Sequence, residues 1–244
     1  MLNSLKVWHD YFLQNRTASD AIAWNAPDTL SDEEKACIGK SIAAFQLGEY
    51  SEGKGLMKAA TAFAQQHGYP DLVPITKLFI GEEQNHALLL KRFMALHWIE
   101  PLKKNWTDTV FRRLRKNVGF ELSLSVLITA EIISLVYYKA LQRSTGSSLL
   151  KAICNKILAD ENAHITYESA ILNHLRHAKP AAIRKLIVLL HQFLLLGTIL
   201  VVYWSHKPVL NRGGDDFSRF FAACWLEFSD RFVPAIVVRA TANA

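Results

Sequence analysis

Residues 82–86 read EEQNH and residues 160–164 read DENAH, so both stretches have the pattern acid-Glu-x-x-His. Side chains three residues apart lie on the same face of an α-helix. Each stretch therefore presents one carboxylate and one imidazole in a common direction, as a metal site requires. The two pairs are Glu83 with His86 and Glu161 with His164.

A single glutamate lies upstream of each pair, Glu49 before the first and Glu131 before the second. The four glutamates occupy helix positions that the surrounding apolar periodicity assigns to Leu or Ile. Burying four acids in a helical core without cations would be very costly. The sequence therefore predicts a buried site for two metal ions. Its expected ligands are Glu49, Glu83, His86, Glu131, Glu161 and His164.

Apolar periodicity and capping signals predict an all-α protein with a single domain. Residues 1–30 form an N-terminal helical extension, residues 31–177 a four-helix bundle, and residues 178–244 C-terminal helices packed on it. The connection 98–119 is long enough to cross the length of the bundle. The expected helices are 2–13, one long helix from the capping box at Ser31 to about residue 65, then 72–97, 120–143, 148–177, a fifth from Pro180 that ends before Pro208, and 215–232.

The motif arrangement in residues 31–177 resembles that of the ferritin-like di-iron carboxylate superfamily. The resemblance implies a ferritin-like bundle in which Glu49 and Glu131 are terminal ligands, Glu83 and Glu161 bridge the metals, and each metal has one histidine. In oxygen-activating relatives, the acid that precedes the motif glutamate often hydrogen-bonds the opposite histidine. Asp160 fits that role. Glu82 is a longer side chain, and a solvated helix acid is an equal alternative.

Other side chains are candidates by their spacing from the ligands. Tyr50 follows a ligand and Tyr138 is seven residues past another, so either could carry a proton or radical; an ordinary core tyrosine is the alternative. Glu168, one turn after His164, is a candidate extra ligand or proton relay. Apolar residues one turn from the ligands are expected to form a substrate pocket: Phe45, Phe79, Leu127, Leu135 and Ile157.

The constellation and the resemblance favour an oxygen-dependent non-haem di-iron oxidase or oxygenase. Its expected cofactors are two iron ions, with manganese as an alternative, and dioxygen is the co-substrate. The expected substrate is small or lipid-like, on a carrier or free, and an external electron donor is needed. The alternative is a ferroxidase and iron store of the ferritin or bacterioferritin type. The three cysteines are isolated, which disfavours a rubrerythrin-type peroxidase; a manganese catalase stays open.

The net charge of +6 is concentrated in a basic cluster within residues 103–116. This cluster is either a solvated connection or a docking site for an acidic partner, and nucleic acid is not expected. The absence of a signal peptide and of paired cysteines favours the cytoplasm, with peripheral membrane contact as an alternative. The apolar stretch Ile187–Trp204 is either a buried or homodimer-interface helix or a membrane-associated one. The basic cluster consists of Lys103, Lys104, Arg112, Arg113, Arg115 and Lys116.

Overall fold

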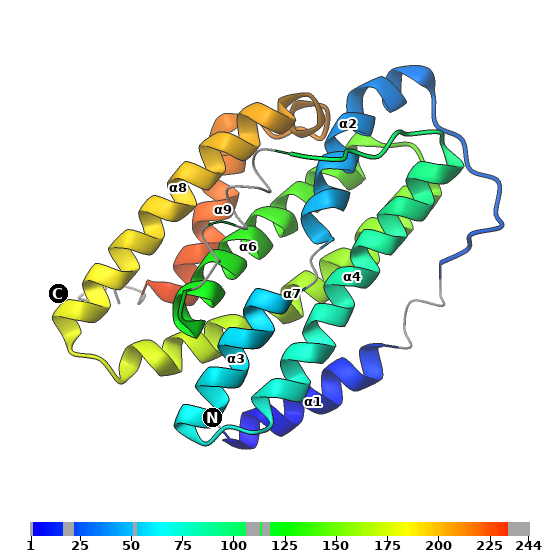
Figure 1. The fold of residues 1–244 in the computed structure, drawn as a ribbon. Helices are drawn as coiled ribbons and strands as arrows, with labels where there is room; N and C mark the ends of the chain where they lie inside the picture. Colours follow the sequence, from blue (N-terminus) through cyan, green and yellow to red (C-terminus); the bar gives the residue numbers. More distant parts are fainter. Residues whose placement is uncertain (1, 17–21, 51–52, 106–112, 114–117, 234–244) are drawn as a thin grey trace, which may run out of the picture.

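The computed structural model describes residues 2–16, 22–50, 53–105, 113 and 118–233 (Figure 1). All of the regular elements within these residues are α-helices, so the prediction of an all-α chain is confirmed. The helices are α1 (Leu2–Asn15), α2 (Asp32–Glu49), α3 (Lys54–His67), α4 (Leu72–Leu96), α6 (Phe120–Ser144), α7 (Ser148–His177), α8 (Ala181–Arg212) and α9 (Phe217–Phe232).

Helices α4, α6 and α7 pack around the centre of the molecule, and α2 followed by α3 completes the group (Figure 1). A short turn joins α6 to α7, and the Ser147 hydroxyl caps α7 by accepting a hydrogen bond from the Leu150 N–H. Asp28 ties this end of the bundle together, because its carboxylate lies 3.0 Å from His97 Nε2 after α4 and accepts a 2.6 Å bond from Ser147. The C-terminal ends of α4 and α6 therefore lie together, and the two helices run in the same direction, as the expected crossover requires.

The prediction of a single helix from Ser31 to about residue 65 is wrong. The first helix ends at Glu49 and the next begins at Lys54, after Gly53 in the left-handed conformation with φ +64°. A side chain at Gly53 would also be too close to α4, because an added Cβ would lie 2.5 Å from Ile80 Cδ1. Glycine permits both the turn and the close approach, and the break places Glu49 at the last turn of α2.

The prediction that the fifth helix ends before Pro208 is also wrong, because α8 continues through Pro208 to Arg212. A proline inside a helix leaves the carbonyl four residues earlier without its usual donor. That carbonyl belongs to Trp204, which is exposed to solvent, so water can hydrogen-bond to the carbonyl. The C-terminal helices α8 and α9 both pack against α6.

By length and composition, two of the described helices, α6 and α8, are apolar enough to cross a membrane. A core helix of a soluble protein has the same properties. In the most apolar window of α6, 83% of the residues are buried, against 33% in that of α8. The central position of α6 explains its apolar character, whereas α8 leaves most of its apolar window uncovered.

Candidate metal centre

The fold brings all six predicted ligands together from α2, α4, α6 and α7. Their ligand atoms form two groups, and within each group the atoms lie within 4.8 Å of one another. Both groups contain Glu83 and Glu161, as expected of two bridging carboxylates. One group adds Glu49 and His86, and the other adds Glu131 and His164. All six are buried, and the most exposed, Glu83, has a relative accessibility of 8%.

Both imidazoles direct Nδ1 towards the carboxylates. The His86 Nδ1 atom lies 3.6 Å from a Glu161 oxygen and 3.7 Å from a Glu83 oxygen. The His164 Nδ1 atom lies 3.0 Å from a Glu83 oxygen and 3.8 Å from Glu161. In each ring Nε2 faces outward, which leaves the Nδ1 lone pair for a metal ion.

Two acids hold these rings in crossed fashion. The Asp160 carboxylate on α7 lies 2.9 Å from Nε2 of His86 on α4, and the Glu82 carboxylate on α4 lies 2.9 Å from Nε2 of His164 on α7. A carboxylate partner places the proton on Nε2 and increases the basicity of the other nitrogen. Asp160 therefore makes the contact with the opposite histidine that its expected role requires, and Glu82 makes the equivalent contact despite its longer side chain.

A further layer of contacts was missed by reasoning from the sequence. Asn15, at the end of α1, donates 2.8 Å hydrogen bonds to both Glu82 and Asp160. Lys156 Nζ lies 2.6 Å from each Asp160 oxygen. Burial alone would raise the pKa of Asp160, but hydrogen bonds from His86, Lys156 and Asn15 hold it below its usual range. The i,i+4 spacing of Lys156 and Asp160 was a detectable signal, whereas Asn15 gave none.

The electrostatics of the ligand cluster fit a cation. Burial raises the pKa of Glu161, and the nearby Glu131 carboxylate raises it further. Among the described residues, both carboxylate oxygens of Glu161 and the Nδ1 atom of His86 are buried without a hydrogen-bond partner. Leaving such groups unsatisfied costs about 1–3 kcal/mol each. Metal ions between these atoms would satisfy them, so the residues present fit a bound metal.

The two candidate tyrosines differ in position. Tyr138 is fully buried and donates a 2.7 Å hydrogen bond to the Glu49 carboxylate. Tyr50 is 54% exposed, so its side chain does not reach into the buried ligand cluster. Glu168 is fully buried but belongs to neither ligand group, so the structure does not place it as an additional ligand.

The five apolar residues expected to form a substrate pocket pack inside the protein. Phe79 packs on His164, with 4.5 Å between ring centroids, and Phe45 stacks on Tyr137 at 3.5 Å. The other three, Leu127, Leu135 and Ile157, are buried core residues. None of the five lines either of the pockets described below, and a role in substrate contact stays a prediction.

A pocket of about 1350 Å³ lies among α1, α3 and α4, and it extends to side chains that support the histidines of the ligand cluster. Glu82, Asn15 and Lys156 all line it. Glu82 contacts His164 directly. Asn15 and Lys156 contact Asp160, which in turn contacts His86. A molecule in this pocket would therefore lie one side chain away from His164.

Comparison of the chain with protein-family models, with curated proteins and with solved structures found no match.

Proposed function

We propose that this chain is a ferritin-like di-iron carboxylate protein that uses dioxygen to oxidise an organic substrate. The observation that carries the proposal is the pair of buried ligand groups that share Glu83 and Glu161. Four helices contribute to these groups, and a chance cluster of buried acids would have no reason to be divided so evenly. The set of carboxylates and imidazoles suits iron or manganese better than a metal that prefers thiolates.

A bound metal pair would supply the electrons that dioxygen chemistry needs. The chain would hold the two ions and keep protons at defined side-chain atoms around them. Glu82 and Asp160 keep the imidazole protons on Nε2, with Nδ1 free for the metals. Tyr138 keeps its proton beside Glu49 Oε1, because burial raises its pKa well above the usual value. A hydroxyl proton is thus held at one end of the ligand cluster. Reducing equivalents have to come from an external donor.

Oxidation of an organic molecule is favoured over iron storage by the pocket that reaches Glu82. Its volume of about 1350 Å³ is larger than the roughly 300–1,000 Å³ of ordinary small-molecule sites. Five Lys and Arg side chains line it, which favours a substrate or donor with an anionic group; they are Arg16, Lys54, Lys58, Lys77 and Lys156. An iron store would require a hollow oligomer rather than an organic site beside the metals.

The test is the stoichiometry of iron oxidation. The metal-free protein is loaded with ferrous iron under anaerobic conditions, and oxygen is then added while oxygen consumption and absorbance are followed. An oxidase stops after about two iron ions per chain in the absence of substrate, and His164→Ala shows no rapid phase. Continued uptake of many ions per chain by a large hollow oligomer would establish iron storage instead.

Docking of an acidic partner at the basic cluster is a separate proposal. Lys103, Lys104 and Arg113 are exposed, whereas the predicted contributions of Arg112, Arg115 and Lys116 lie outside the described residues. Reversing the charge of Lys103 and Lys104 should slow turnover with a protein-bound substrate or donor and leave oxidation of free ferrous iron unchanged. Equal turnover by the parent and the variant would contradict this docking role.

A further inference from the structure

Helix α8 carries large apolar side chains on its exposed side as well as on its buried side. Its buried side carries His191, Thr198 and His206, whose relative accessibilities are 3–6%. These side chains are used inside the protein: His191 lies 3.0 Å from Thr129 of α6, and His206 lies 2.7 Å from Ser41 of α2. Apolar residues of α8, among them Leu195 and Leu210, are buried on the same side. Polar and apolar contacts therefore fix the orientation of α8 together, whereas an ordinary surface helix would expose a polar face opposite them.

The outer side of α8 carries the large apolar side chains. Phe193 is 62% exposed, Leu190 59% and Trp204 64%. Apart from the adjacent Leu189 and Leu190, the exposed residues follow one another at three- and four-residue steps, which places them on one continuous stripe. A contiguous exposed apolar surface of this kind marks an interaction site rather than chance exposure. The outer face of α8 consists of Ile183, Leu186, Leu189, Leu190, Phe193, Leu196, Leu200 and Trp204.

Every charged residue of α8 is basic. Arg184 and Lys185 lie in its first turns and Lys207 and Arg212 near its end, and the helix contains no Asp or Glu. The uncharged stretch between Lys185 and Lys207 is about 33 Å long at 1.5 Å per residue. Lys207 also lies over the ring of Trp204, 5.1 Å from its centroid. Exposed tryptophan and flanking basic residues are typical of a helix that lies in the headgroup region of a membrane.

The charge distribution distinguishes a lipid surface from a second copy of the chain. A twofold dimer pairs a face with itself. Pairing α8 with α8 would bring only basic charges together at both ends, whether the helices were parallel or antiparallel. Anionic lipid headgroups would instead neutralise Arg184, Lys185 and Lys207, with a favourable contribution for each basic residue near the surface. Arg212 already pairs with Glu33, 2.7 Å away.

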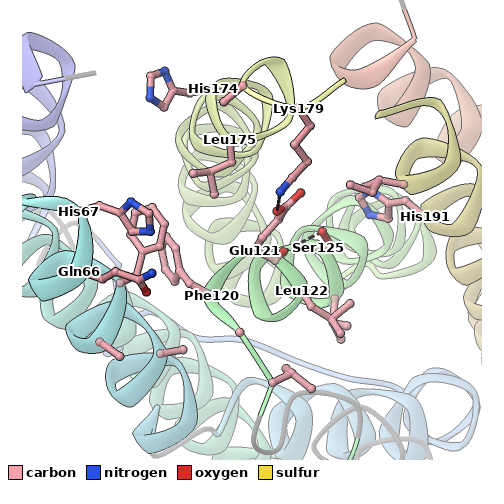
Figure 2. Close-up of a pocket in the computed structure, with 18 of the residues that line it drawn as sticks. Gln66, His67, Phe120, Glu121, Leu122, Ser125, His174, Leu175, Lys179 and His191 are labelled. Carbon is pink, nitrogen blue, oxygen red and sulfur yellow. Dashed lines mark hydrogen bonds and ion pairs between the residues drawn. The ribbon is translucent and has the colours of Figure 1, made fainter. Parts of the chain in front are cut away.

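A second large pocket, of about 1350 Å³, adjoins this face among α3, α6, α7 and α8 (Figure 2). Ile187, Leu190 and Leu194 of α8 line it, so apolar surface continues from the exterior of the helix into the pocket. Figure 2 shows His191 on one side of the pocket and Lys179 pointing to Glu121, 3.1 Å away, on another. The pocket thus combines an apolar entrance with polar and basic groups, as an amphipathic lipid would require.

We propose that the outer face of α8 docks the protein on an anionic lipid surface. The other side of α8 remains packed on α6 and α9, so the helix lies along the surface and does not span the bilayer. Docking depends on the apolar stripe and on the basic residues at its two ends. It is independent of the metal chemistry.

The test is flotation of the full-length protein with lipid vesicles. One set consists of phosphatidylcholine with about one third phosphatidylglycerol, and the other of phosphatidylcholine alone. The parent protein should float with the anionic vesicles, and Leu189→Glu with Phe193→Glu should reduce the bound fraction at least tenfold. Replacing Lys185 or Lys207 by Ala should weaken binding about fivefold for each residue removed.

Leu88→Glu is the matched control, because Leu88 is 59% exposed but lies on α4, away from the outer face of α8. This variant should bind vesicles like the parent, and circular dichroism should show that all the variants are folded. Failure of the parent to bind anionic vesicles would overturn the proposal. So would a parent dimer, seen by light scattering, that becomes monomeric in the double variant without any lipid binding; the occupant of the face would then be a second copy.

Discussion

Replacing Glu161 by Gln is the sharpest test of the metal centre. Glu161 is fully buried and belongs to both ligand groups. Its oxygens lie 3.6 Å from His86 Nδ1 and 3.8 Å from His164 Nδ1. Glutamine keeps the shape of the side chain but removes the negative charge, so Glu161→Gln should weaken the binding of both metal ions rather than one.

The magnitudes can be estimated for the two states of the protein. Each ion present at about one hundred times its Kd stabilises the folded state by about 2.7 kcal/mol, so two ions contribute about 5 kcal/mol. For a chain of this size that corresponds to a rise of about 10–20 °C in Tm. Without metal the sign is reversed: Glu161→Gln removes a buried carboxyl whose ionised form is disfavoured by burial and by Glu131, and should stabilise the metal-free protein by up to about 3 kcal/mol.

The assay is thermal unfolding with a chelator and with anaerobic ferrous iron or manganese, together with metal analysis. Glu168→Gln is the matched control, because Glu168 is equally buried on α7 but lies outside both ligand groups. The control should keep two ions per chain and the rise in Tm. Two ions per chain in Glu161→Gln, with an undiminished rise, would refute the assignment of Glu161 as a shared ligand.

Three further changes test the surroundings of the site. Asp160→Asn removes the charged partner of His86 and should lower metal affinity about 10- to 100-fold; an unchanged affinity in a competition titration would exclude this role. Gly53→Ala combines a left-handed φ with contacts of 2.5–2.8 Å to Ile80 and should cost about 2–5 kcal/mol in urea unfolding; a neutral result would show that the helix break is not needed. Burial lowers the pKa of His206 from 6.5 to about 4, so stability should fall as the pH drops from about 6.5 towards 4, by about 2 kcal/mol at pH 5. His206→Gln should make this part of the stability profile flatter, and an identical slope would contradict the burial argument.

The sequence was sufficient for the helical class and for the six Glu and His residues that the fold brings together, because both depend on local periodicity. Glu-x-x-His defines its own geometry within one helical turn, and glutamates at core positions are recognisable from the apolar residues around them. The direction of α6 relative to α4 also followed from the length of the connection between them. These properties require no knowledge of which helices are neighbours.

Tertiary packing alone decided the remaining features. The contacts of Asn15 with Glu82 and Asp160 join α1 to α4 and α7 across large sequence separations, and no local pattern specifies them. The break at Gly53 depends on how closely α3 approaches Ile80. The apolar stretch of α8 looked equally suited to a core, a dimer or a membrane, because composition does not say which side of a helix faces the protein. The buried contacts of His191, His206 and the apolar residues beside them fix that rotation, and they leave a second apolar face of α8 turned outward.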